Sequence, residues 1–261
     1  MTVGGLLALV LATYTWGFQT VLFLKLRSEE KTLPLLGFTP QKLASLSVNQ
    51  NPGTKLVHSA YVFEVPWSDL DETKSKKFSH SSVFAFHSGN VVAVFGPNPA
   101  NNGLMSTVEK SFGGLNSETV RQVFGPETVS SNYQFEKTLL EETPSDLKPW
   151  TNKREAVRAS FLLLIKGIAS VGGNTGIFAV EADGWKGFQF DDPAKKPKRV
   201  AVELFDTQDE QMEIIFYQRS GSSLSLTQAD INRAIKTLSA EESANDASAR
   251  TAKDKKERRR D

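Results

Sequence analysis

The chain has 261 residues, of which 39% are hydrophobic, and its 31 Lys and Arg residues nearly balance its 30 Asp and Glu residues. This balance gives no general electrostatic attraction to nucleic acid, so nucleic acid is not expected as a partner. The complete lack of cysteine excludes a disulfide framework, thiolate catalysis and thiolate metal sites.

The first segment, residues 1–27, is predicted to be a transmembrane anchor. From Val3 to Leu24 there is no charged residue, and a helix of this length, at about 1.5 Å per residue, reaches roughly 33 Å and crosses a hydrocarbon core of about 30 Å. A cleavable signal peptide is the main alternative, but residues 1–5 lack Lys and Arg, and residues 13–16 lack an A-x-A cleavage pattern. A buried core helix is the other alternative.

The basic residues near this segment predict its orientation. Lys25, Arg27 and Lys31 follow the apolar run, and only the α-amino group precedes it. Because Lys and Arg beside a span are retained on the cytoplasmic side, the pattern predicts a single-pass protein of the cell membrane. Its N-terminus would lie outside and its soluble domain in the cytoplasm.

One face of the predicted span is small and polar. At about 100° per residue, six residues fall within one arc: Gly4, Gly5, Ala8, Ala12, Thr15 and Gln19. Small residues let helices approach closely in lipid, and a glutamine amide there favours a hydrogen-bonding partner. The face is therefore a candidate contact with a second copy of the chain or with another membrane protein. The alternative is that it makes no specific contact, since small residues are common in spans.

Residues 28–50 are predicted to be a juxtamembrane connector with a short helix. Thr39 and Pro40 have the form of an N-cap followed by proline at the first helical position, and the helix would end near Ser47. A soluble domain over residues 51–240 should follow. Its first elements are a strand over residues 55–65 and a polar surface loop over residues 67–80.

The middle of the soluble domain mixes a hairpin with helices. Residues 83–86 and 91–95 are predicted to pair around a turn that contains Gly89. Helices over residues 104–112 and 118–124 and a strand over residues 132–140 come next. Asn152, with Glu155 three positions later, then caps a helix predicted over residues 153–170.

The last part of the domain carries the clearest strand signals. Residues 177–182 and 185–190 flank Asp183-Gly184, a type I′ turn pair, and strands over residues 199–205 and 212–218 follow. Thr227 and Asp230 form a capping box for a helix whose apolar residues share one face. An antiparallel meander with packed helices makes the fold class of the body α+β.

Residues 241–261 are predicted to be a disordered basic tail. The segment has no aromatic residue and ends in the charged run from Lys253 to Asp261. Such a tail could contact anionic lipid or RNA, but acidic residues interrupt the basic run, which favours a solvated tail.

Candidate catalytic groups are few, and the sequence leaves the catalytic residues unknown. His58, His80 and His87 are the three histidines; if they met Asp69 or Asp71 they could bind zinc or act as a base. None lies in an H-E-x-x-H arrangement, and surface or structural histidines are the favoured alternative. No cofactor and no metal site is predicted.

Two tryptophans lie in proline-containing loops. Trp67 and Trp150 are candidate partner anchors, because tryptophan is enriched at binding hot spots, although covering a core edge is the commoner role. The sequence as a whole predicts a membrane-anchored binding or scaffold protein, with the lipid bilayer as one partner. The alternative is a membrane-tethered hydrolase or transferase that uses the loop histidines and aspartates.

Overall fold

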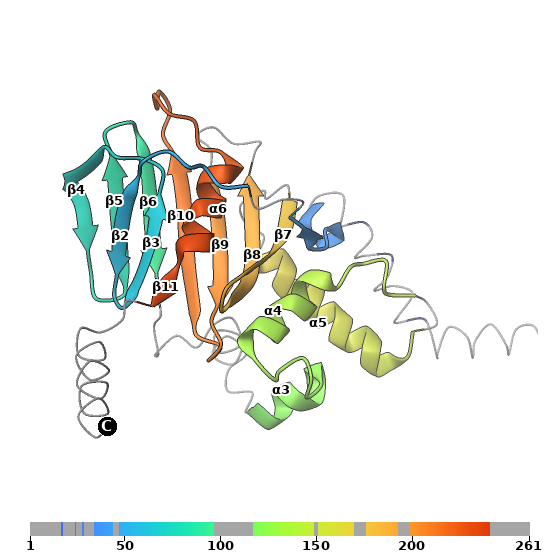
Figure 1. Cartoon of the computed structure of the whole chain (residues 1–261). Helices are drawn as coiled ribbons and strands as arrows, with labels where there is room; N and C mark the ends of the chain where they lie inside the picture. Colours follow the sequence, from blue (N-terminus) through green and yellow to red (C-terminus); the bar gives the residue numbers. More distant parts are fainter. Residues whose placement is uncertain are drawn as a thin grey trace, which may run out of the picture. The chain divides into compact units, whose positions relative to one another are not determined.

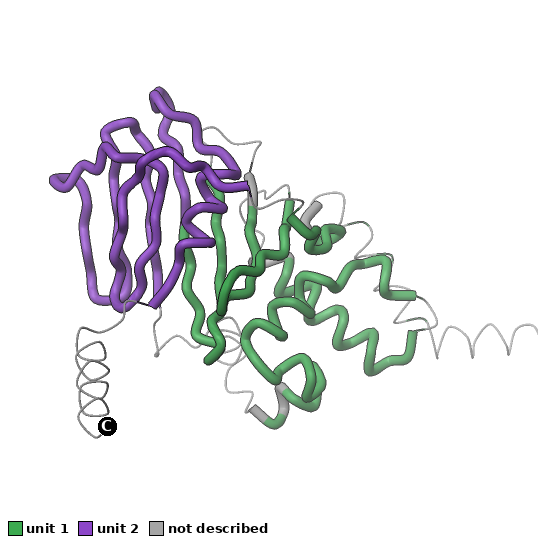
Figure 2. The backbone as a smooth tube through the Cα atoms, viewed as in Figure 1, with its two compact units in different colours: residues 1–44, 97–214 green, residues 45–96, 215–261 purple. Residues whose placement is uncertain are grey.

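The computed structural model describes residues 34–43, 47–96, 117–148, 151–169, 176–192 and 199–240, together with Gly17, Leu24 and Ser28. These residues form a mixed α/β structure with a large sheet (Figure 1). The chain divides into two compact units: unit 1 comprises residues 1–44 and 97–214, and unit 2 comprises residues 45–96 and 215–261 (Figure 2).

Unit 1 combines helices with a group of sheet strands. Its elements are η1 Pro34–Gly37, β1 Gln41–Lys42, α3 Ser117–Phe124, α4 Asn132–Glu141, α5 Lys153–Ala169, β7 Gly176–Ala182, β8 Trp185–Asp192, β9 Arg199–Phe205 and the start of β10 Gln211–Gln218. The strands lie in the order β1-β7-β8-β9-β10. β1 runs parallel to β7, whereas β7, β8 and β9 pair antiparallel in sequence.

Helix α4 covers one face of these strands. Leu140 packs with Ile177 of β7 and Phe188 of β8, and the Tyr133 ring stacks on Phe188 at a centroid distance of 5.6 Å. Phe188 is paired in register with Glu203 of β9, and directly paired residues on neighbouring strands point to the same side of a sheet. The face beneath α4 therefore carries Glu203 as well as aromatic rings.

Unit 2 is built from two small groups of strands and one helix. Its elements are β2 Thr54–His58, β3 Tyr61–Val65, β4 Leu70–Lys77, β5 Ser81–Phe86, β6 Asn90–Phe95, the end of β10, α6 Gln228–Thr237 and β11 Ser239–Ala240. The strand orders are β10-β6-β5-β4 and β11-β3-β2. Helix α6 packs on β3, where Arg233 pairs with Glu64 at 2.8 Å.

Several predicted elements are confirmed, and the α+β character of the body agrees with the structure. The Asp183-Gly184 turn joins β7 and β8, with Gly184 at a φ of 76°. The capping box of Thr227 and Asp230 begins α6, with both of its reciprocal hydrogen bonds formed. The predicted helix after Asn152 is α5, and Asn152 Oδ1 accepts from the Glu155 N–H at 2.9 Å.

The strand predicted over residues 132–140 is wrong, because these residues form helix α4. Tyr133, Phe135 and Thr138 suit a strand by propensity, but the buried side chains follow helical spacing at Phe135, Glu136, Leu139 and Leu140. Ser131 caps the helix by accepting from the Gln134 N–H at 3.0 Å. Tertiary burial therefore outweighs local strand propensity here.

Three further predictions near the start of the domain are wrong. The single strand over residues 55–65 is two strands, β2 and β3, because Ser59 takes a left-handed φ of 54° and reverses the chain. The polar loop over residues 67–80 contains strand β4, which pairs with β5 despite its lysines. Lysine on an edge strand is a common protection against pairing with other chains. The short helix after Pro40 is instead strand β1.

The membrane-spanning part of the predicted fold class is contradicted. Among the residues that the structure describes, no helix is both long enough and apolar enough to cross a bilayer. The longest of them, α5, has 17 residues and carries Lys, Arg and Glu side chains, so its apolar stretch serves the core of unit 1. The predicted orientation relative to a membrane depends on this span, and the described residues do not test it.

Some predictions fall outside the described residues. These are the contact face of Gly4, Gly5, Ala8, Ala12, Thr15 and Gln19, the helix over residues 104–112, Trp150 and the tail over residues 241–261. The structure does not test them.

Candidate functional site

Unit 2 contains an open pocket of about 440 Å³. Its walls come from the stretch after β3, the turn between β5 and β6, and the loop after β10. The lining residues are Pro66, Trp67, Ser68, Asp69, His87, Ser88, Ser223 and Leu224. Among these only Asp69 and His87 have ionisable side chains, and neither Lys nor Arg lines the pocket.

Trp67 forms a fixed wall of the pocket. Its side chain is only 4% exposed, and its ring meets the Phe86 ring edge to face at 5.2 Å, an arrangement favoured by aromatic quadrupoles. The Thr54 hydroxyl donates to the Trp67 carbonyl at 2.6 Å. The side chain therefore belongs to the core of unit 2, and Trp67 lines the pocket from there.

The β5–β6 turn brings a second wall against the Asp69 stretch. Gly89 takes a φ of 95° in this turn, a conformation that a side chain would strain. The backbone N–H of His87 donates to the Asp69 carbonyl at 2.9 Å, and the N–H of Ser88 donates to Asp69 Oδ2 at 2.5 Å. One carboxylate oxygen of Asp69 is thereby occupied.

The loop after β10 supplies the third wall, and Ser222 holds it in place. The Ser222 hydroxyl donates to the Ser88 carbonyl at 2.7 Å, and the N–H of Ser223 donates to the same oxygen at 3.0 Å. A Cβ atom on Gly89 would lie only 3.2 Å from the Ser222 backbone, so glycine also allows this close approach. Leu224, 45% exposed, lies at the rim.

Two buried oxygens at the pocket have no hydrogen-bond partner among the described residues. These are Asp69 Oδ1 and Ser88 Oγ, and Ser88 as a whole is 7% exposed. A buried polar atom without a partner costs about 1 to 3 kcal/mol. Such atoms gathered at one pocket are therefore candidates for contact with a bound molecule.

The side chains of Asp71 and His87 lie close together beside the pocket. Asp71 Oδ2 lies 3.6 Å from His87 Nδ1 and 2.9 Å from Lys74 Nζ. The hydrogen bond from Lys74 and the one from the Thr73 hydroxyl hold the pKa of the Asp71 carboxyl well below its usual range. Asp71 is therefore a carboxylate at neutral pH, and it can orient the His87 ring.

The other two histidines are not part of this site. His58 is buried in β2, where Nδ1 lies 2.8 Å from the Ser82 hydroxyl and Nε2 lies 2.5 Å from the Gly96 carbonyl. Burial lowers the pKa of His58, which fits a neutral structural histidine. His80 is exposed just before β5 and lines no pocket described here.

The structure thus brings together three of the five side chains proposed from the sequence, Asp69, Asp71 and His87. Within the described ranges, no group of three or more His, Asp or Glu residues could hold a metal ion. Sequence reasoning missed Ser88 and Ser223. Ser88 is separated by 134 positions from Ser222, which holds the opposite loop, and no local pattern signals such a contact.

Comparison with known proteins does not extend this description. No model of a known protein family matches the chain, and no curated protein is similar to it in sequence.

Proposed function

We propose that the protein is a binding protein and that the pocket beside Trp67 receives a cationic group of its ligand, an ammonium or a guanidinium. The observation that carries the proposal is the pair of buried, unpartnered oxygens, Asp69 Oδ1 and Ser88 Oγ, at the wall of this pocket. A donor from the ligand would supply the missing hydrogen bonds, and Trp67 would offer an aromatic surface.

The charges around the pocket favour a cation over a neutral donor. Asp69 has no ion-pair partner among the described residues, whereas the nearby Asp71 is already paired with Lys74. With neither Lys nor Arg in the lining, a ligand cation would meet no repulsive side chain except a protonated His87. An acidic side chain with one free oxygen is suited to an N–H donor that carries charge.

The test uses two small probes that differ in charge and have nearly the same shape, methylguanidinium and methylurea. The full chain would be labelled with ¹⁵N, and the Trp67 indole signal would be assigned with Trp67→Phe. Methylguanidinium should shift this signal with a dissociation constant on the order of 1 mM, as befits so small a fragment. Methylurea should shift it far less.

Matched variants assign the effect to the acidic oxygen. Asp69→Asn keeps the shape of the side chain and should abolish the preference for methylguanidinium. Glu72→Gln, at an exposed position of neighbouring β4, removes the same charge outside the pocket and should bind like the wild type. Equal responses to the two probes, or binding unaffected by Asp69→Asn, would exclude the proposal.

A second candidate function, hydrolysis or group transfer, is favoured by the pairing of Asp71 with His87 at the pocket. In this arrangement His87 would act as a general base oriented by a carboxylate. Hydrolysis of 4-nitrophenyl acetate by the full chain tests it, with His87→Gln as the variant. If the wild type is no faster than free imidazole at the same concentration, or than the variant, this candidate fails.

A further inference from the structure

Three carboxyl groups meet beneath helix α4 in unit 1. Glu136 projects from α4 and is 3% exposed. Glu203 of β9 is paired in register with Phe188 and so lies on the sheet face beneath α4, and the neighbouring Glu203 and Glu213 carboxyl groups add to burial in raising the pKa of Glu136. Two carboxyl groups can share a hydrogen bond only if one of them holds a proton. A proton held by one of these carboxyl groups would therefore relieve the repulsion between them at the contact of the helix with the sheet.

No positive group neutralises Glu136 within the described part of the chain. Glu136 Oε2 is buried and has no hydrogen-bond partner. The amide of Gln211 donates to Glu203 at 3.4 Å, and Arg199 acts on Glu213. A full negative charge on Glu136 would therefore be buried beside two further carboxyl groups, which is strongly unfavourable.

The remaining charged groups around α4 are engaged elsewhere. Lys186 of β8 has its Nζ 4.2 Å from the centre of the Tyr133 ring, and Glu181 of β7 also acts on Tyr133. Asp209 accepts hydrogen bonds from the first N–H groups of the helix. Arg158 and Lys166 of α5 contact Glu142 at the helix end. None of them is among the groups that act on Glu136. Protonation is therefore the means left to keep this contact neutral.

We propose that the docking of α4 on the sheet of unit 1 is a proton-dependent switch, held closed by a proton that Glu136 and Glu203 share and opened when that proton is lost. Loss of the proton should affect the docking of α4 locally, because α4 is attached to the strands through a short apolar row that includes Leu140, Ile177 and Phe188. As the pH rises, repulsion among the three carboxylates opposes this apolar contact. Burial and the neighbouring carboxyl groups raise the pKa of Glu136 and raise the pKa of Glu213 to about 7.

Hydrogen exchange of the full chain tests the switch. Protection factors, corrected for the intrinsic exchange rate at each pH, would be measured for the α4 amides from Phe135 to Leu140 at about pH 5.5 and about pH 8.5. They should fall by about tenfold or more, since each unit of pKa shift is worth a factor of ten. Amides of the β7–β8 hairpin, which lacks these carboxyl groups, should change much less.

Glu136→Gln supplies the decisive variant, because it keeps the side chain nearly the same size but cannot ionise. Its α4 protection should no longer depend on pH. Glu141→Gln, on the same helix with a side chain 54% exposed, is the matched control and should behave as the wild type. Glu203→Gln gives a second route to the same result if Glu136→Gln does not fold. Wild-type protection that is equal at both pH values, or pH dependence that survives in the folded Gln variants, would overturn the proposal.

Discussion

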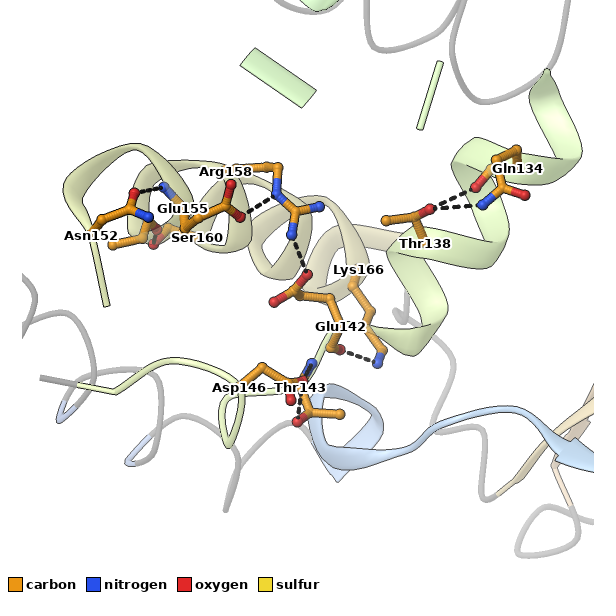
Figure 3. Close-up of polar contacts among 11 residues, drawn as sticks. Gln134, Thr138, Glu142, Thr143, Asp146, Asn152, Glu155, Arg158, Ser160 and Lys166 are labelled. Atoms are coloured by element: carbon orange, nitrogen blue, oxygen red, sulfur yellow. Dashed lines mark hydrogen bonds and ion pairs between the residues drawn. The ribbon is translucent and has the colours of Figure 1, made fainter. Parts of the chain in front are cut away.

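Lys166 in unit 1 and Ser88 in unit 2 are both buried polar side chains, but their surroundings differ. The Lys166 ammonium group, completely buried, donates to the carbonyls of Phe38, Leu140 and Glu142 at 2.7 to 2.8 Å. Figure 3 shows it reaching the backbone of Glu142. The Ser88 hydroxyl has no partner among the described residues. A buried group whose hydrogen bonds are complete serves the fold, whereas one left incomplete indicates where something else can bind.

Lys166 joins three segments that are distant in the sequence. Its partners lie just after η1 and at the C-terminal end of α4, and the lysine itself belongs to α5. Burial lowers the pKa of Lys166 to about 8, against the attraction of Glu142 and Asp146. The carbonyls at the end of α4 carry the negative end of the helix dipole, so an ammonium group complements them.

The largest expected change in stability comes from Lys166, the buried group whose hydrogen bonds are complete. Lys166→Met keeps most of the apolar stem but leaves several buried carbonyls without a donor. It should lower the free energy of unfolding by about 3 kcal/mol or more, measured by urea unfolding followed by circular dichroism. Lys137→Met, at an exposed position of α4, should change it by less than about 0.5 kcal/mol. A similar effect of the two substitutions would show that the Lys166 contacts do not stabilise the fold.

The carboxyl groups under α4 should give a somewhat smaller, pH-dependent effect. The pKa of Glu213 is raised to about 7 from an ordinary value of 4.5, so between these values the folded state holds a proton that the unfolded state has released. This contribution to stability is complete below about pH 4.5 and is lost as the pH rises through about 7. Its size is about 2 to 3 kcal/mol.

Glu213→Gln cannot hold or lose this proton, so it isolates the contribution. The difference in unfolding free energy between the variant and the wild type should move in favour of the variant as the pH rises from about 4.5 to about 7.5. Urea unfolding at a series of pH values measures it. A difference that stays constant with pH would mean that Glu213 titrates as an ordinary exposed carboxyl.

The smallest expected effects compare two buried serines of unit 2. The Ser82 hydroxyl lies 2.8 Å from His58 Nδ1, and Ser82→Ala should cost about 1 to 2 kcal/mol, because it leaves a buried ring nitrogen without its partner. Ser88→Ala removes a buried atom that has no partner, so it should not lower stability and should raise it by about 1 kcal/mol, because the cost of the unpartnered hydroxyl is removed. Thermal unfolding of the two variants measures these changes in stability. If Ser88→Ala lowers stability as much as Ser82→Ala does, the Ser88 hydroxyl has a hydrogen-bond partner within the fold.

The sequence was most informative where one short pattern specifies one local structure. The Asp183-Gly184 turn and the Thr227–Asp230 capping box depend on residues at most three positions apart. The strand predicted in place of α4 failed because the choice depended on burial. Phe135 and Leu139 meet Phe124 and Leu162 of neighbouring helices, and no local pattern reveals that contact.

In the candidate site, too, the sequence indicates the residue types, and only the fold decides which of them meet. Asp69, Asp71 and His87 could be named from the sequence as groups capable of chemistry, but nothing in it separated them from His58 and His80. Pairing of β4 with β5 is what brings Asp71 to His87.

The sequence by itself determined the residue types present, the clearest turns and caps, and the absence of cysteine chemistry, because these depend on neighbouring residues or on composition alone. Only the tertiary structure decided which polar groups are buried and whether their hydrogen bonds are complete. Lys166, Glu136 and Ser88 looked unremarkable in the chain. Their importance comes from partners, or missing partners, contributed by distant segments, and hydrogen bonds act only over the few ångströms that folding closes.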